Sequence, residues 1–293
     1  MEEIRKIRKG DYPPQLLEIP QVPEELFVRG TLPQDDALLL CVVGSRKHTE
    51  YGKEVCEKIL SELRGFPIVI VSGLALGIDA IAHRAALKAG LQTVAFPGSG
   101  LSQKVLYPAS NFGLAETILK AGGALISEFE PDFKATPYAF PQRNRLMAGF
   151  CHATLVIEAG EKSGTLITAR LATEYNKDVF AVPASIFSQN AVGSNWLLKQ
   201  GAIPVTSGED ILVHWNLISE SRSTNSSAGE ELRIPEECTD EEKMVIALLH
   251  DPLYKTELIQ KLDIPISEIN ILLSSMEIKG LIKETLGELH VNF

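Results

Sequence analysis

The chain has 293 residues, of which 45% are hydrophobic, and a formal net charge of −10. No apolar run reaches about 18 residues, and the N-terminal segment MEEIRKIRKG has charges but no apolar stretch. We therefore expect neither a transmembrane helix nor a signal peptide. The length favours one large domain with an appendage.

The charge is unevenly distributed along the chain. Residues 236–293 contain 12 acidic and 5 basic residues, a net charge of −7, whereas residues 31–215 contain 17 acidic and 16 basic residues. The middle segment can therefore hold a local basic patch. The four cysteines form no C-x-x-C motif, and Cys41 and Cys151 lie in or near apolar stretches. We expect these two thiols in the core of a cytoplasmic protein.

Apolar runs alternate with amphipathic stretches through the middle of the chain. We predict strands within residues 37–46, 67–73, 92–100, 124–129, 153–160, 178–185 and 202–208. We predict helices at about residues 49–64, 77–90, 113–123, 165–176 and 194–200. Near-continuous Val, Ile and Leu strands separated by helices indicate a mostly parallel sheet covered on both faces. The expected fold class is α/β, with a Rossmann-like, doubly wound sheet.

The predicted strands end in small residues. They read V-G-S-R, V-S-G-L-A-L-G, F-P-G-S-G and I-E-A-G-E-K-S-G-T, each just before a helix. Ligands of such sheets bind at the carboxyl ends of the strands, where helix N-termini favour anions. We therefore expect an anion site at this edge. The alternative is that these glycines only allow tight turns between strand and helix.

Familiar cofactor sites are not evident. The turns do not complete G-x-G-x-x-G or G-x-x-x-x-G-K-[ST], and no metal-ligand spacing or Ser-His-Asp order stands out. We therefore expect no cofactor and no metal. Phosphates of a mononucleotide or a polynucleotide remain as ligands.

The segment FPQRNRLMAG, residues 140–149, combines basic, amide and aromatic side chains before the fifth predicted strand. We expect a loop and a short helix here. Arginine suits phosphate oxygens and stacks on bases, and basic groups between aromatics are typical of single-strand binding surfaces. The side chains concerned are Phe133, Lys134, Tyr138, Phe140, Arg143, Asn144 and Arg145. Alternatively, the arginines pair within the fold with Glu128, Glu130 or Glu158.

Together these motifs resemble the DNA-processing protein A family (DprA, also called Smf). The resemblance covers residues 40–215 through GSR (44–46), SGLALGIDAIAH (72–83), FPGSGL (96–101), YPASN (107–111), SEF (127–129), FPQRNRLMAG (140–149), EAGEKSGTLITA (158–169), FAVP (180–183) and GSNWLLKQGA (193–202). It implies an extended Rossmann fold that pairs as a homodimer. It also implies a non-enzymatic cytoplasmic protein of natural transformation, which protects incoming single-stranded DNA and loads the RecA recombinase onto it.

The resemblance also implies site residues. It assigns phosphate binding to Arg46 of GSR, a backbone-amide pocket to the turn at 72–77, and a helix N-terminus to residues 163–165. Asp79, in the first helical turn, is expected to cap its helix. The DNA-binding residues implied in full are Gly44, Ser45, Arg46, Ser72, Gly73, Gly77, Lys134, Phe140, Arg143, Asn144, Arg145, Ser163, Gly164, Thr165, Asn195 and Lys199.

The chain departs from the family in two places. Only about 36 residues precede the first strand of the Rossmann-like domain, which is too short for the helical module of the SAM type that many members have. The Y-P-x-x-N turn contains Ala109 and Ser110, where many members have a basic residue. This removes one possible phosphate contact.

The C-terminal part reads as a separate domain. We predict three helices in the segments DEEKMVIALL, KTELIQKL and ISEINILLSSMEIKG, and a β-hairpin in LIKETLGELHVNF, which together form a winged-helix pattern. We expect a short N-terminal extension at 1–36, the Rossmann-like DNA-binding domain at 37–215, a Ser-rich linker at 216–235 and a winged-helix-like domain at 236–293. The acidic charge argues against DNA binding by the last domain. It is interpreted either as a module for protein interaction or self-association, or as a weakly functional domain.

Two other function classes each require a feature that this sequence lacks. A Rossmann-type nucleoside-monophosphate phosphoribohydrolase would need P-G-G-x-G-T-x-x-E, but the nearest segment, EAGEKSGTLIT, lacks the glutamate. A transcriptional regulator with a ligand-sensing core would need a basic winged helix. We therefore predict a DNA-binding protein and not an enzyme.

Overall fold

The computed structural model describes residues 3–219 and, nearer the C-terminus, residues 239–249, 253–255, 258–259, 262, 265–285 and 288–291. The chain divides into two compact units, Met1–Ser223 and Thr224–Phe293. No helix among these residues is long and apolar enough to cross a membrane.

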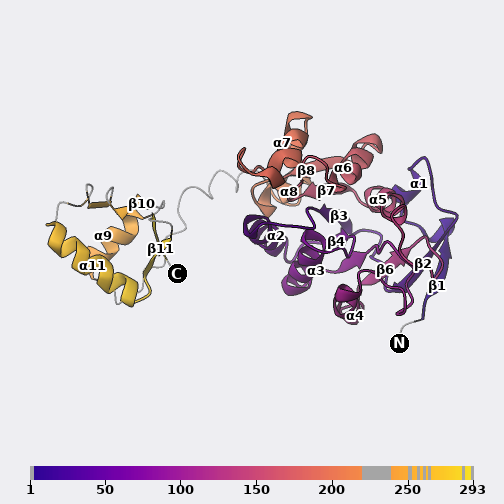
Figure 1. Ribbon diagram of the computed structural model, residues 1–293, viewed down its shortest axis with the longest axis horizontal. Helices are drawn as coiled ribbons and strands as arrows, with labels where there is room; N and C mark the ends of the chain where they lie inside the picture. Colours follow the sequence, from indigo (N-terminus) through magenta and orange to yellow (C-terminus); the bar gives the residue numbers. More distant parts are fainter. Residues whose placement is uncertain are drawn as a thin grey trace. The chain divides into compact units, whose positions relative to one another are not determined.

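The N-terminal unit is built on a nine-stranded sheet with the order β1-β2-β6-β5-β4-β3-β7-β8-β9 (Figure 1). The strands are β1 Arg5–Arg8, β2 Glu25–Gly30, β3 Leu38–Val43, β4 Ile68–Ser72, β5 Thr93–Ala95, β6 Ala124–Ser127, β7 Ala153–Val156, β8 Asp178–Ala181 and β9 Ile203–Pro204. All neighbouring strands from β6 to β9 run parallel. The predicted doubly wound, mostly parallel α/β sheet is confirmed.

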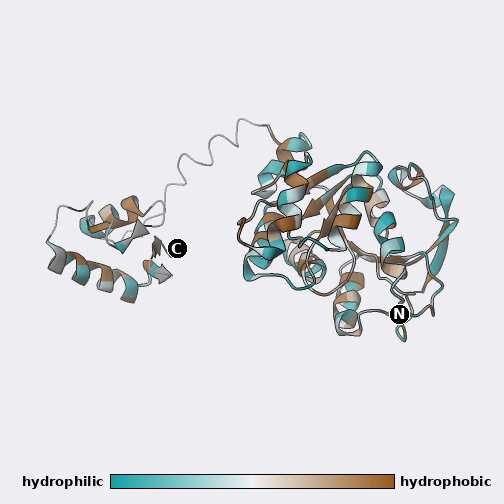
Figure 2. Cartoon of the chain, turned by 45° about the horizontal axis from the view of Figure 1, so that its top comes forward, coloured by the Kyte–Doolittle hydropathy of each residue, from teal (hydrophilic) through white to brown (hydrophobic). Residues whose placement is uncertain are grey.

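Helices cover both faces of this sheet, because side chains of successive strand residues point to opposite faces. From β3, Leu40 and Val42 pack in one cluster with α2, α3 and α8, whereas Cys41 and Val43 pack in another with α1, α5, α6 and α7. The central strands are largely apolar, whereas the outer helix faces are largely polar (Figure 2). The helices are α1 Pro14–Leu17, α2 Glu50–Glu62, α3 Ile78–Ala89, α4 Phe112–Lys120, α5 Ala139–Phe150, α6 Thr165–Glu174, α7 Val192–Lys199 and α8 Gly208–His214. Cys41 and Cys151 are fully buried, as predicted.

Residues 5–30 do not form an extension separate from the sheet. Strand β2 pairs antiparallel with β6, and β1 pairs antiparallel with β2. Leu26 and Val28 face the same cluster as α5, and an ion pair of 2.7 Å joins Lys6 to Glu25. The N-terminal segment therefore completes one edge of the sheet.

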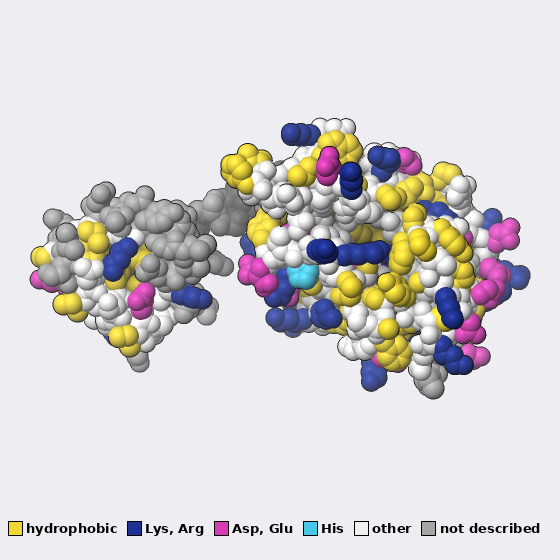
Figure 3. All heavy atoms as spheres, viewed as in Figure 1, with side chains coloured by type: hydrophobic (Ala, Val, Ile, Leu, Met, Phe, Trp, Pro, Cys, Tyr) yellow, Lys and Arg dark blue, Asp and Glu magenta, His cyan; other side chains and the backbone are white. Residues whose placement is uncertain are grey.

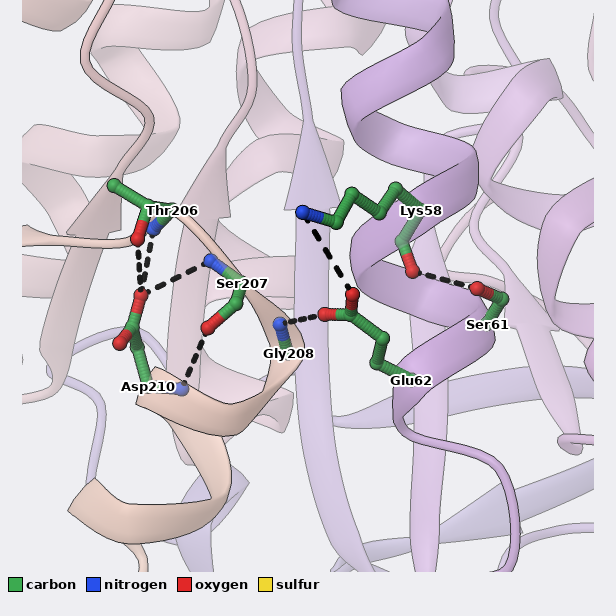
Figure 4. A network of polar contacts seen from close by, with 7 residues as sticks. All are labelled: Lys58, Ser61, Glu62, Thr206, Ser207, Gly208 and Asp210. Carbon is green, nitrogen blue, oxygen red and sulfur yellow. Dashed lines mark hydrogen bonds and ion pairs between the residues drawn. The ribbon is translucent and has the colours of Figure 1, made fainter. Parts of the chain in front are cut away.

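Helix α8, which the sequence pattern did not reveal, is fixed by side-chain caps at its N-terminus (Figure 4). The Asp210 amide donates to the Ser207 hydroxyl over 3.3 Å, and the Asp210 carboxylate accepts from the Ser207 amide over 3.0 Å. Glu62, at the end of α2, accepts from the amide of Gly208 over 2.5 Å. These contacts satisfy amides that the first helical turn leaves unpaired.

The C-terminal unit contains helices α9 Asp240–Leu248 and α11 Ile266–Ile278, with strands β10 Leu253–Tyr254, β11 Ile282–Thr285 and β12 Glu288–Val291. Strands β11 and β12 pair antiparallel as the predicted hairpin. The predicted middle helix, KTELIQKL, and the linker at 216–235 lie largely outside the described residues. The winged-helix assignment therefore stays a prediction.

Candidate nucleic-acid interface

A cavity of about 620 Å³ opens beyond the carboxyl ends of β3 and β7. The strand order reverses at this pair: β4, β5 and β6 follow on one side of β3, and β7, β8 and β9 on the other. Ligands of open α/β sheets bind at such a switch point. The lining side chains come from the loops after β3 and β7, from α5, from the starts of α3 and α6, and from Asn190 before α7. Figure 3 shows basic and apolar side chains next to each other across the middle of this unit.

The loop after β3 is held close to the start of α3 by glycine. Gly77 has φ of +80°, and a Cβ there would lie 2.3 Å from the carbonyl oxygen of Ser45. The Ser45 hydroxyl donates to the carbonyl of Lys47 over 2.9 Å and thereby closes the loop. This packing places the side chains of Arg46 and Lys47 in the lining of the cavity.

Arg46 is exposed and lies over an aromatic ring. Its guanidinium carbon is 5.0 Å from the ring centroid of Phe140, a distance suited to a cation–π contact. Phe140 packs against the backbone of Gly98, where a Cβ would lie 2.7 Å from the ring. On another side it meets Tyr107, with ring centroids 5.8 Å apart.

Helix α5 presents one face to the cavity. Phe140, Arg143, Asn144 and Met147 all line it, and their spacing of three, one and three residues marks one side of an α-helix. Arg145 is on a different side, where its guanidinium pairs with Glu128 and donates to the carbonyl of Gln21. The structure therefore brings Arg143 and Asn144 to the site but directs Arg145 into the fold.

Arg143 is a buried cation in the cavity wall. It donates to the carbonyl oxygen of Phe96 at the end of β5, and it lies against Gly73, where any Cβ would collide with it. Its Nε has no hydrogen-bond partner among the described residues. Burial lowers the pKa of the guanidinium, Asp79 opposes this effect, and Arg46 adds to it. An anion in the cavity would compensate a buried, partly unsatisfied charge of this kind.

Asp79 is the only acidic residue in the lining of the cavity that the structure describes. Burial raises the pKa of its carboxyl, although Arg143 and backbone amides act in the opposite direction. Its carboxylate accepts from the amide of Ala75 over 3.4 Å. The helix begins after Gly77 without a side-chain cap, so the expected capping role of Asp79 is wrong. The carboxylate orders the preceding loop instead.

The N-terminus of α6 also faces the cavity. Ser163, Gly164 and Thr165 line it, as the resemblance implied. The amide of Thr165 donates to the Ser163 hydroxyl over 3.2 Å. The positive end of the helix dipole and the first-turn amides favour an anion at this position.

Besides Arg145, six implied residues lie away from the lining of this cavity: Ser72, Gly73, Gly77, Lys134, Asn195 and Lys199. Gly73 packs against the side chain of Arg143, and Gly77 packs against the carbonyl of Ser45. Ser72 is buried and donates to the carbonyl of Val42 over 2.7 Å, so its hydroxyl is engaged within the sheet. Asn195 exchanges hydrogen bonds with the backbone of residue 184. Lys134 and Lys199 are exposed outside the cavity lining.

Sequence reasoning missed four polar residues in the lining: Lys47, Lys162, Thr168 and Asn190. Lys162 stands inside the motif EAGEKSGT and Lys47 directly follows the motif GSR, so proximity to these turns was an available signal. Asn190 donates to the carbonyl of Lys47 over 2.9 Å, from a loop far along the chain. No local pattern indicates that contact.

Glu158, considered above as a partner of the arginines, has other contacts. It is buried at the end of β7 and accepts from the backbone amide of Thr49 over 3.0 Å and from its hydroxyl. Thr49 in turn caps α2. The cavity lining therefore keeps four basic side chains, Arg46, Lys47, Arg143 and Lys162, against the single carboxyl of Asp79.

Comparison with known proteins identifies one family. Residues 3–216 match the family model described as DNA recombination-mediator protein A. Protein Smf of Escherichia coli is 40% identical over 230 residues, which cover 76% of this chain and 61% of that protein. The DNA processing protein DprA of Streptococcus pneumoniae is 41% identical over 204 residues, covering 70% of this chain and 71% of that one. The chain thus spans less than two thirds of the length of the E. coli relative.

Two solved structures are similar to the N-terminal unit. One is DNA processing protein A from S. pneumoniae, with a TM-score of 0.68 at 39% identity, covering 72% of this chain and 74% of that one. The other is DNA processing protein A from Helicobacter pylori, described for its single-stranded DNA binding mode. Its TM-score is 0.64 at 28% identity, covering 74% of this chain and 99% of that one.

Proposed function

Because the chain belongs to the DNA recombination-mediator protein A family, we propose that it binds single-stranded DNA in the cavity beyond β3 and β7. The observation that carries this proposal is the set of four basic side chains in the cavity lining, one of them buried, facing a single carboxyl. Such a lining suits phosphates.

Phosphate groups fit two parts of the cavity. Exposed Arg46, Lys47 and Lys162 can follow the sugar–phosphate backbone, since long basic side chains adapt to a chain of anions. The N-terminus of α6 supplies backbone amides for a further phosphate. Binding of this kind is independent of base sequence.

The bases of the DNA can stack on aromatic side chains at the edge of the cavity. Phe140 lies between Arg46 and Tyr107, and the Tyr107 and Tyr138 side chains are exposed. Aromatic rings accept any base by stacking and discriminate weakly between bases. The combination of phosphate and stacking contacts favours unpaired strands, whose bases are accessible.

The protein is proposed to act without catalysis. Gly164 and Thr165 are followed by Leu166, Ile167 and Thr168, so the carboxylate of the phosphoribohydrolase signature is missing. The carboxyl of Asp79 is buried and engaged with a backbone amide. The cavity is thus proposed to hold a ligand rather than to transform it.

The further roles follow from the family. We propose that the chain acts in the cytoplasm during natural transformation, protects incoming single strands and loads RecA recombinase onto them. We also propose that it forms homodimers through the Rossmann-like unit. The exposed apolar side chains near the start of α7 support such an interface.

The binding proposal is tested by fluorescence anisotropy with labelled oligo-dT and a matched duplex. The variant Arg46→Ala/Lys47→Ala/Lys162→Ala removes exposed cations and leaves buried Arg143 in place. We expect tight single-strand binding by the wild type and at least a tenfold weaker affinity in the variant. Its slope of log K against log salt should be shallower by about 2, at about 0.7 for each phosphate that the variant no longer neutralises.

The matched control is Lys9→Ala/Lys120→Ala/Arg170→Ala, which removes the same charge from exposed positions outside the cavity lining. Its affinity should stay within twofold of the wild type. Equal binding by wild type and cavity variant would disprove the site. Base release from nucleoside monophosphates by the wild type would instead support the phosphoribohydrolase alternative.

A further inference from the structure

A second basic hollow lies between helices α2 and α3, apart from the cavity described above. Its volume is about 400 Å³, and its lining includes Lys58 and Arg64 near the end of α2, with Arg84 and Lys88 on α3. All four side chains are exposed. Figure 3 shows Lys and Arg side chains grouped over this part of the unit. We refer to these four residues as the α2–α3 groove.

Small residues form the floor of the groove. Ala85 and Ala89 are buried and line it, on the side of α3 that packs toward α2. Because alanine fills little space, it leaves a hollow between the two helices. The long basic side chains rise on both sides of this floor.

The charges of the groove are not balanced locally. Arg64, Arg84 and Lys88 have no ion pair or side-chain hydrogen bond within the part of the chain that the structure describes. Arg84 and Lys88 are four residues apart on one helix, an arrangement of like charges that destabilises the helix. Lys58 Nζ lies 3.9 Å from Oε1 of Glu62, which is a long ion pair. Glu57 is the one acidic residue in the lining of the groove. A chain with net charge −10 thus concentrates uncompensated cations here.

We propose that the α2–α3 groove is a second contact surface for the phosphates of a DNA strand that is bound in the cavity. The inference rests on the proposed function of that cavity. The groove has basic side chains but no aromatic residue in its lining, so it suits phosphates and gives no platform for bases. Its exposed walls also lack the enclosing polar groups of a small-molecule site.

Helix α2 connects the two surfaces. Lys47 lines the cavity just before α2 begins, and Arg64 lines the groove just after α2 ends. The 15 residue-to-residue steps from Thr49 to Arg64 span about 22 Å at the helical rise of 1.5 Å per residue. A strand that leaves the cavity along α2 therefore reaches the groove only when it is long enough to cover this distance.

Oligonucleotide length provides the test. Anisotropy is measured for dT6, dT12, dT20 and dT30 with the full chain and with Arg64→Ala/Arg84→Ala/Lys88→Ala. We expect unchanged affinity for dT6 and a loss that grows with length to at least fivefold for dT30. The salt slope for dT30 should be shallower by about 2, because three cations no longer neutralise phosphates.

The control removes the same charge elsewhere, as Lys9→Ala/Lys120→Ala/Arg170→Ala, and should bind every length like the wild type. No loss at any length would overturn the groove as a contact surface. A loss equal for dT6 and dT30 would also overturn it, since that pattern reflects overall charge. If the wild type binds neither dT6 nor dT30, the cavity proposal itself has failed. If the wild type binds dT6 normally, only the groove is in question.

Discussion

Arg143 and Arg145 differ by two positions, yet the fold gives them opposite surroundings. Arg143 is buried in the wall of the cavity with an unpartnered Nε, whereas Arg145 pairs with Glu128. Two residues along a helix turn by about 200°, so the two side chains leave on different faces of α5. The alternative of an internal ion pair is thus confirmed for Arg145 only.

Burial keeps another residue, His83, in its neutral form near pH 7. The Thr93 hydroxyl donates to the carbonyl of Ile70 over 2.8 Å, so it accepts from Nδ1–H of His83 over 2.7 Å. Burial, followed by the charges of Arg143 and Arg84, lowers the pKa of His83 to about 3. The unfolded chain therefore binds this proton more readily than the folded chain.

This difference predicts a pH dependence of stability. Above pH 6.5 the imidazole is neutral in both the folded and the unfolded chain, so it adds no pH dependence. As the pH drops from 6.5 toward 3, only the unfolded chain takes up the proton, and the free energy of unfolding falls. Between pH 6.5 and 5.0 the free energy of unfolding should fall by up to about 2 kcal/mol, at about 1.4 kcal/mol per pH unit. Urea unfolding at pH 7.5 and 5.0 measures it.

The control variant is His83→Gln, whose amide can still donate to Thr93. Its free energy of unfolding should fall less on acidification than that of the wild type, by up to about 2 kcal/mol. Asp79 is present in both proteins, so its own titration cancels in the difference. Equal pH dependence of the two proteins would show that folding does not lower the pKa of His83.

Among the elements, α5 was the hardest to predict. The sequence predicts a loop and a short helix at residues 140–149, but one helix runs through all of them. Pro141 stands in its first turn, where the missing amide is not needed. The long apolar strands were predicted well because burial on both faces requires a continuous apolar run. Strands β1 and β2 were missed, since their sequences RKIR and ELFVRG mix charged with apolar residues and become strands by pairing at the sheet edge.

The cap of α8 leads to a prediction at this scale. Ser207→Ala removes the hydroxyl that accepts from the Asp210 amide and should lower the free energy of unfolding by about 1 kcal/mol. Urea denaturation measures the change. Thr117→Ala, whose hydroxyl bonds only to the carbonyl of Gly113 in its own helix, should change stability by less than about 0.5 kcal/mol. Equal effects would show that the cap is not a distinct contribution.

At the scale of the whole molecule, an apolar patch stands out on the N-terminal unit. Ile186 and Phe187 are 81% and 92% exposed, and Val192 and Trp196 on α7 are each 45% exposed. Several large apolar side chains within eleven residues of one another favour a contact surface over chance exposure. The patch is the place where we expect the proposed homodimer to form.

Phe187→Asp should therefore shift the protein from dimer to monomer, because a carboxylate would lose its hydration in the interface. Analytical ultracentrifugation over a range of protein concentrations measures the dissociation constant, which should rise at least tenfold. Leu17→Asp, at another exposed apolar residue of the same unit, is the control and should leave it unchanged. A monomeric wild type, or a Phe187→Asp dimer of unchanged affinity, would contradict this interface.

The sequence by itself determined the alternation of strands and helices between β3 and β9, the glycine turns at the strand ends and the family, because these depend on local pattern. It also identified most of the polar residues around the cavity. Only the tertiary structure decided which basic side chains share the cavity, since that depends on the helical face of α5 and on loops brought together by the sheet. The same holds for the α2–α3 groove, whose cations come from two segments at least 20 positions apart and meet through helix packing.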